Sequence, residues 1–277
     1  MGPELGCAKK KDNREGKVDV LVHCDTKAAR LKCLERGIRM DAVVSIAAVL
    51  GILIGTGLLI GLLRPSEFSL RWLLVATGIV ALNDFLLTNG YGLFPQIFEG
   101  TQWNWQGKIL ALASSLAIAS LPWLGWRRSG ITLVQAPGSL RSCAPLAIAY
   151  CMFFLAIALA FPAEDAATET IAFQLTMPSL EEETFYRGIL LLALYEAFAG
   201  RTKKFGVEWG WGAFLSCALF GLAHAFSYSD GSFAFDPVYM VLTAIPSFLA
   251  VWMRLRTGSL LLPVALHSIG NSIGLIV

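Results

Sequence analysis

Apolar stretches of membrane-spanning length follow one another along this chain from residue 41 to the end. A helix needs about 20 predominantly apolar residues to cross the hydrocarbon core of a bilayer. Backbone groups in lipid must find their hydrogen bonds within the protein, so such stretches predict helices. Eight stretches approach this length, and they cover residues 42–63, 71–90, 108–126, 143–161, 171–199, 209–227, 238–254 and 259–277.

Charged residues are scarce outside the first 39 positions. They make up 15% of the 277 residues, whereas a soluble domain carries roughly 25%. Residues 1–39 alone hold 10 of the 22 lysines and arginines and 6 of the 20 acidic residues. We therefore predict an all-α fold, a polytopic integral membrane helix bundle with about eight transmembrane helices over residues 41–277. A polar, basic N-terminal tail over residues 1–40 precedes it, and we expect the function not to need residues 1–39.

Basic residues lie almost entirely on one side of the predicted bundle. The connections after the first, third, fifth and seventh stretches carry ten of them, and the opposite connections carry only Lys108. Because Lys and Arg are retained in cytoplasmic loops, both ends of an eight-helix core are expected outside the cytoplasm. The basic tail then falls on the unexpected side. A miscounted span, a tail that folds back, or a functional start at Met40 would resolve this, and we favour the start at Met40.

The composition also narrows the choice of partners. No basic run is interleaved with aromatic residues, so we expect no binding to nucleic acid. The six cysteines form no CxxC pair, which removes a common signature of zinc and redox sites. We expect a multi-pass protein of the plasma (inner) membrane, with the lipid bilayer and a membrane-associated protein or peptide as its partners.

An acidic triplet interrupts the fifth apolar stretch. Glu181, Glu182 and Glu183 are followed by Arg187, four residues after the last carboxylate. Each charge at membrane depth costs about 2.5 to 3.5 kcal/mol on insertion scales, so such groups persist where they pair, face a cavity or carry out chemistry. Glu183 and Arg187 share a helix face and can pair. Glu182 points about 100° away and is free for another partner.

Two of the three histidines lie in later apolar stretches. His224 comes one turn after Phe220, and His267 comes one turn before Asn271. Desolvation raises the pKa of a carboxylate toward that of a useful general base, and an imidazole can share the proton. Imidazole N–H and Asn amide groups can donate hydrogen bonds to an oxyanion. No covalent nucleophile lies beside a base, so these residue types favour direct attack of water on a peptide carbonyl.

The three spacings, taken together and in this order, resemble a known family. This chain is similar to the CAAX-protease and bacteriocin-processing (abortive-infection-like) family of intramembrane proteases. The similarity lies in three motifs of the chain, which are Glu182-Glu183-xxx-Arg187, Phe220-xxx-His224 and His267-xxx-Asn271. These motifs cover residues 182–271, about a third of the chain.

The resemblance implies a role for each residue of the motifs. Glu182 would be the base that activates water, aided by His224, and His267 and Asn271 would hold the oxyanion. Three residues would support the site, namely Glu183, Arg187 and Phe220. The implied activity is an endopeptidase that cleaves a membrane-associated protein or peptide, with prenylated CAAX-type proteins as the substrates of the best-known relatives. Glu181 is a bystander in this interpretation.

Other interpretations stay open. Glu182, His224 and His267 can also be a zinc ligand set with an open position for water. Because no HExxH helix is present, we favour glutamate catalysis without a required cofactor and keep zinc or another divalent metal as the alternative. A non-catalytic immunity or scaffold protein that retained the protease fold is a second function. A transporter that uses the buried acids as a proton relay is a third, and the absence of an internal repeat counts against it.

Overall fold

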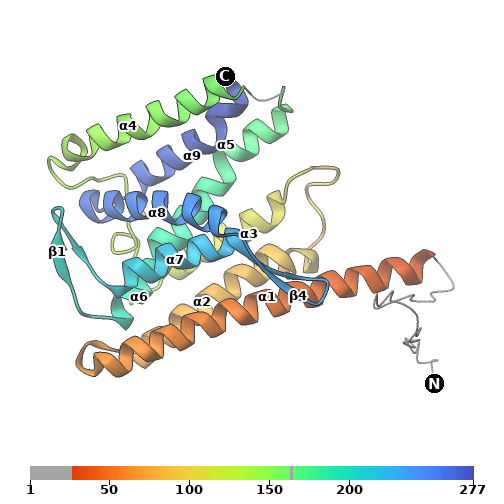
Figure 1. The fold of residues 1–277 in the computed structure, drawn as a ribbon, viewed down its shortest axis with the longest axis horizontal. Helices are drawn as coiled ribbons and strands as arrows, with labels where there is room; N and C mark the ends of the chain where they lie inside the picture. Colours follow the sequence, from red (N-terminus) through yellow and green to blue (C-terminus); the bar gives the residue numbers. More distant parts are fainter. Residues whose placement is uncertain (1–26, 163–164) are drawn as a thin grey trace.

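The structure is a computed structural model that describes residues 27–162 and 165–277, with side chains described from Met40 onward. Helices dominate these ranges, and two short hairpins extend from them (Figure 1). The α-helices are α1 (Lys27–Leu63), α2 (Leu70–Thr88), α3 (Trp105–Ala119), α4 (Ser139–Ala160), α5 (Thr168–Glu182), α6 (Leu191–Ala197), α7 (Trp211–Ala225), α8 (Pro237–Thr257) and α9 (Leu261–Ile276). The other elements are the 3₁₀ turns η1 (Pro65–Glu67) and η2 (Gly90–Leu93), the π-helix η3 (Glu183–Leu190), and the strands β1 (Thr202–Lys204), β2 (Val207–Trp209), β3 (Phe226–Ser229) and β4 (Ser232–Phe235).

The helices form a bundle whose middle holds the segments that carry the motifs. Helices α1 and α2 pack together along one long edge, and α4 and α9 pack together along the opposite edge (Figure 1). Helix α5 contacts both α9 and α3, while α7 contacts α6 and α8. The ends of α5 and α7 and the middle of α9 therefore approach one another inside the bundle.

The fifth predicted stretch is one helical segment that changes its winding beside the acidic triplet. It runs from α5 through η3 into α6, and Pro178 lies within α5 without ending it. The π-helix begins at Glu183, directly after Glu182. Such wide turns are rare and occur mostly at functional sites, because they change the direction of the side chains that follow. The change in winding therefore sets where Arg187 points relative to the carboxylates.

The largest hydrophobic core packs η3 and α6 against the first two helices. Its members are buried aliphatic and aromatic side chains, each worth roughly 1.5–3 kcal/mol when fully buried. They include Leu53, Leu73, Phe185, Ile189, Leu190, Leu194 and Phe198. This core fixes one side of the π-helix and leaves the opposite side to the polar residues of the motifs.

All eight predicted stretches coincide with helical segments, but the predicted number of spans is not confirmed. In the described residues, four helices are long and apolar enough to cross a membrane by length and composition, namely Met40–Leu63, Leu70–Thr88, Ser139–Ala160 and Pro237–Thr257. Trp211–Ala225 and Leu261–Ile276 are apolar but shorter, and 15 residues of helix extend only about 23 Å. The chain is thus a helical membrane protein in which about half of the expected helices reach full spanning length.

Two β-hairpins are the elements that the all-α prediction missed. Strands β1 and β2 flank Phe205-Gly206, and β3 and β4 flank Asp230-Gly231. All four of these turn residues have positive φ, between 51° and 82°, as a two-residue type I′ turn requires. Asp-Gly between short strands is a strong local hairpin signal, so the sequence contained the information for the second hairpin.

The predicted boundary at residue 40 falls inside a helix. The backbone of α1 is helical from Lys27 and continues through Met40 to Leu63. Most of the predicted tail, residues 1–26, lies outside the described residues. The proposed functional start at Met40 stays a prediction.

Candidate active site

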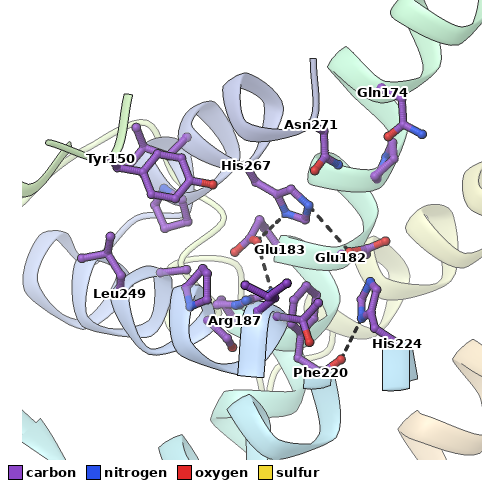
Figure 2. Close-up of a pocket in the computed structure, with 18 of the residues that line it drawn as sticks. Tyr150, Gln174, Glu182, Glu183, Arg187, Phe220, His224, Leu249, His267 and Asn271 are labelled. Atoms are coloured by element: carbon purple, nitrogen blue, oxygen red, sulfur yellow. Dashed lines mark hydrogen bonds and ion pairs between the residues drawn. The ribbon is translucent and has the colours of Figure 1, made fainter. Parts of the chain in front are cut away.

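A cavity of about 620 Å³ opens where α5, η3, α7 and α9 meet (Figure 2). It is lined by all seven residues that the sequence motifs single out, namely Glu182, Glu183, Arg187, Phe220, His224, His267 and Asn271. These residues come from three separate segments, spread over about 90 positions of sequence. Only the packing of α5, α7 and α9 brings them together.

Glu183 and Arg187 form the predicted ion pair at the wall of the cavity. Arg187 Nη1 lies 3.2 Å from Glu183 Oε1, and both side chains are buried. The Arg187 guanidinium also stacks over the Phe220 ring, with 4.1 Å between its central carbon and the ring centroid. A buried cation gains from the negative face of an aromatic ring. Phe220 therefore supports the site by holding the arginine, in addition to packing beside it.

His267 connects the two carboxylates. Its Nδ1 lies 2.8 Å from Glu183 Oε1, and its Nε2 lies 3.8 Å from Glu182 Oε2 (Figure 2). Because a carboxylate accepts, Nδ1–H is the donor in the contact with Glu183. This contact fixes the ring and turns Nε2 toward Glu182 and the cavity. The ion pair therefore orients an active-site imidazole, which the spacing alone did not reveal.

His224 lies on the other side of Glu182, in the last turn of α7. Its Nδ1 is 2.8 Å from the carbonyl oxygen of Phe220. A carbonyl can only accept, so the neutral ring carries its proton on Nδ1 and leaves Nε2 unprotonated. Figure 2 shows the ring beside the Glu182 carboxylate. An unprotonated nitrogen and a carboxylate that face one space can together accept a proton.

Lys108 is the site residue that sequence reasoning missed. Its Nζ lies 2.6 Å from Glu181 Oε2 and 2.8 Å from Glu182 Oε1. Asn104 caps α3 by accepting a hydrogen bond from Gly107 N at 2.8 Å, which places Lys108 in the first turn. The sequence did contain a signal, because Lys108 is a solitary basic residue among acidic and apolar connections. That position was used only to predict the topology.

The contact with Lys108 also corrects the interpretation of Glu181. The Glu181 carboxyl is fully buried and shares the ammonium group with Glu182. It is therefore part of the charge balance of the site and not a bystander. A sequence cannot show this, because the partner lies 73 positions away on another helix.

Helix α9 is held in register with its neighbours by two close contacts. The Ser179 and Ser268 hydroxyls lie 2.7 Å apart and join α5 to α9. Gly270 leaves room for the Tyr150 hydroxyl, which would lie 2.4 Å from a Cβ at that position. Both contacts lie between His267 and Asn271 in sequence, so they hold the part of α9 that carries these two residues.

The contact with Lys108 bears on the alternative metal set of Glu182, His224 and His267. In the part of the chain that the structure describes, no three His, Cys, Asp or Glu residues are grouped so as to hold a metal ion. The Lys108 ammonium lies against Glu182. A divalent ion bound to Glu182 would have to share that carboxylate with a cation within 3 Å.

Comparison with known families agrees with this geometry. Residues 165–273 match the family model described as "Type II CAAX prenyl endopeptidase Rce1-like". The matched segment is less than half of the 277 residues, and it contains all three motifs. No curated protein and no solved structure matches the chain. Over residues 165–273, the chain is therefore similar to the Rce1-like type II CAAX prenyl endopeptidases.

Proposed function

We propose that this protein is an intramembrane endopeptidase that hydrolyses a peptide bond of a membrane-associated protein or peptide. The observation that carries the proposal is that Glu182, His224, His267 and Asn271 line one cavity. They come from three separate helices, α5, α7 and α9. The similarity of residues 165–273 to the family model supports the same class of reaction.

In the proposed mechanism, Glu182 and His224 activate the attacking water together. Lys108 stabilises the ionised form of Glu182, which makes the carboxylate available as a base and also weakens it. The unprotonated Nε2 of His224 compensates by accepting or sharing the proton. Water held between these two groups would attack the peptide carbonyl carbon, form the C–O bond and lose its proton to the pair.

His267 and Asn271 would stabilise the oxyanion that forms on the carbonyl oxygen. With Nδ1–H directed to Glu183, His267 would donate to the oxyanion from Nε2 when the ring is protonated. The Asn271 amide supplies a second donor from the next turn of α9. Removing one such donor in proteases costs about 10²–10³ in rate. Collapse of the intermediate would break the C–N bond, and the proton held by Glu182 and His224 would pass to the leaving amine.

The rest of the cavity suggests the character of the substrate. Its wall away from the carboxylates is apolar and is built by Phe154, Leu242, Pro246, Leu249 and Met253. Such a surface suits a hydrophobic side chain or a lipid group next to the scissile bond. A prenylated C-terminal peptide is one substrate of this kind, and the family description supports it.

The proposed mechanism uses Glu182 and His224 without a metal ion. We expect purified enzyme to keep its activity in a strong chelator such as 1,10-phenanthroline. Loss of activity on chelation, with recovery on addition of zinc alone, would contradict this. The non-catalytic scaffold stays the alternative function.

The decisive experiment is a cleavage assay with fluorogenic farnesylated and unprenylated CAAX-type peptides. We expect Glu182→Gln and His224→Ala each to lower kcat at least about a hundredfold, the usual contribution of a general base. Lys203→Met, a change at an exposed residue of β1, serves as the matched control. Cleavage that survives Glu182→Gln would refute the mechanism. Absence of cleavage by folded parent protein would favour the scaffold function.

A further inference from the structure

The β3–β4 hairpin begins directly after the last turn of α7, two residues from His224. Its turn is Asp230-Gly231, with φ of 51° and 82°. The strands pair Phe226 with Phe235 and Ser229 with Ser232. The hairpin thus starts at an active-site histidine and projects from the end of the helix that carries it (Figure 1).

The alternation of hydrogen-bonded and non-hydrogen-bonded pairs in the hairpin identifies the backbone groups on its outer edges. In an antiparallel pair, residues alternate between those that bond across the ladder and those whose N–H and C=O point outward. Asp236 N donates to Ala225 O at 2.8 Å, which makes 225/236 a bonded pair. With the observed register, 227/234 and 229/232 are bonded pairs as well. The N–H and C=O groups of Phe233 and Phe235 therefore point away from β3.

The outer edge of β3 shows the same alternation, and helix α1 covers this edge. Tyr228 is an outward-facing residue of β3 by the same alternation, and its N–H donates to Ser45 Oγ of α1 at 2.8 Å. Helix α1 therefore closes the β3 edge. Strand β4 has all four residues exposed, including Phe233 at 58% and Phe235 at 54%. An uncovered edge with unpaired backbone groups readily accepts another extended chain.

The open edge is continuous with the candidate active site. A second cavity, of about 470 Å³, is lined by His224, by Ala225–Ser227 and by Ala234–Pro237. His224 lines this cavity and the active-site cavity as well. A chain that lies along β4 at Phe235 is thus next to the wall that His224 forms. Hydrolysis by water needs the peptide extended and held on both sides of the scissile bond.

We propose that the outer edge of β4 is a substrate-binding site, where an extended segment of the substrate peptide pairs with the backbone of Phe233 and Phe235 and is directed to Glu182 and His224. This site rests on the proposed endopeptidase function and adds to it a mode of recognition by main-chain hydrogen bonds. Binding of this kind tolerates many side chains at the paired positions. Phe226, Tyr228 and Phe233 form an aromatic face on the hairpin. The centroid of the Phe233 ring lies within 5.4 Å of the centroids of both other rings, and this packing stiffens the strand that offers the edge.

Phe233→Pro and Phe233→Ala form a matched pair for the first test. Both remove the ring, but only proline removes the outward N–H, and proline is tolerated on an edge strand because this N–H is not part of the ladder. Binding is measured by fluorescence polarisation of labelled farnesylated and unprenylated CAAX-type peptides to the full chain carrying Glu182→Gln. We expect Phe233→Pro to weaken binding about tenfold relative to Phe233→Ala, the usual effect of one lost hydrogen bond. Equal affinities would overturn the proposal.

Peptides with a single N-methyl group provide a test on the unaltered strand. Because side chains and backbone groups alternate along a strand, methylation of every second peptide nitrogen should weaken binding, and methylation of the intervening ones should not. A scan without this alternation, or no binding of either peptide, overturns the β4 site. If Phe233→Pro instead dissociates a dimer and leaves peptide affinity unchanged, the edge belongs to a second copy of the chain.

These measurements separate the β4 site from the proposed function. Cleavage that depends on Glu182 in the parent protein supports the endopeptidase whatever the edge does. Cleavage that depends on Glu182 together with equal affinities for the two Phe233 variants refutes the edge alone. Absence of cleavage by the folded parent protein refutes the proposed function, even where the N-methyl scan shows alternation.

Discussion

Single residues in the active site are arranged as a chain of charges. Lys108 neutralises Glu181 and Glu182, Arg187 neutralises Glu183, and His267 lies between the two groups. Six charged or titratable groups are close together in an apolar bundle, so each depends on its neighbours for its energy. The roles of Lys108 and Arg187 differ, because Arg187 is fixed by an aromatic ring and Lys108 makes its contacts through a flexible stem.

Lys108→Met tests the charge balance at this scale. The substitution leaves the fully buried Glu181 beside Glu182 without a cation, and removing one partner of a buried pair costs about 3–5 kcal/mol. We expect a lower unfolding temperature in detergent and at least about a tenfold loss of cleavage. Lys108→Met combined with Glu181→Gln should recover much of the stability, since one buried charge is then gone. Equal unfolding temperatures for the parent and Lys108→Met would show that the contact with Glu181 contributes nothing.

At the scale of elements, the contact between α4 and α9 sets the position of the residues that would hold the oxyanion. Gly270 faces Tyr150 of α4 and lies between His267 and Asn271 in sequence. Gly274 is one turn further along α9 and has no atom within 4 Å of the place where its Cβ would be. The two glycines therefore differ in packing while they share a helix.

We expect Gly270→Ala to impair cleavage and Gly274→Ala to leave it unchanged. The new methyl group would lie 2.4 Å from the Tyr150 hydroxyl, and overpacking of this kind typically costs about 1–3 kcal/mol. Either α9 or Tyr150 must move, and a shift of α9 displaces His267 from Glu183. Adding Tyr150→Phe removes the clashing oxygen and should restore activity to Gly270→Ala. The measurement is kcat/KM for the three variants, and a deficit that persists with Tyr150→Phe would argue against this contact as the cause.

For the whole molecule, the two hairpins mark opposite ends of helix α7. The β1–β2 hairpin ends before Trp211, and the β3–β4 hairpin starts after Ala225. Lys203 and Lys204 lie in the first, whereas Asp230 is in the turn of the second. Basic residues favour the cytoplasmic side, so the β4 edge and the mouth at His224 are predicted on the other side of the membrane.

Cysteine labelling tests this arrangement in intact cells. In a background without native cysteines, we expect Ser232→Cys to react with a membrane-impermeant maleimide. We expect Lys203→Cys to react only after the cells are permeabilised. Both positions are exposed, so access is limited by the membrane and not by burial. The reverse pattern would place the active site toward the cytoplasm, where a cytosolic prenylated substrate could reach it directly.

The sequence by itself determined the membrane class, the positions of the helical segments and the seven residues of the motifs. This was possible because apolar length and i, i+4 spacing are local properties that a helix preserves. The Asp230-Gly231 hairpin was equally local and could have been predicted from its turn residues. The number of full-length spans could not be predicted, because several helices end before the apolar stretches that contain them.

Only the tertiary structure decided how those residues meet. It placed Lys108 of α3 on Glu181 and Glu182, directed His267 to both Glu182 and Glu183, and stacked Arg187 on Phe220. It also left the β4 edge open beside His224. These contacts join positions between 33 and 85 residues apart, and their geometry depends on how α3, α5, α7 and α9 pack and on the π-turn after Glu182. Spacing within one helix carries no information about such packing, so the partners of each charge had to come from the fold.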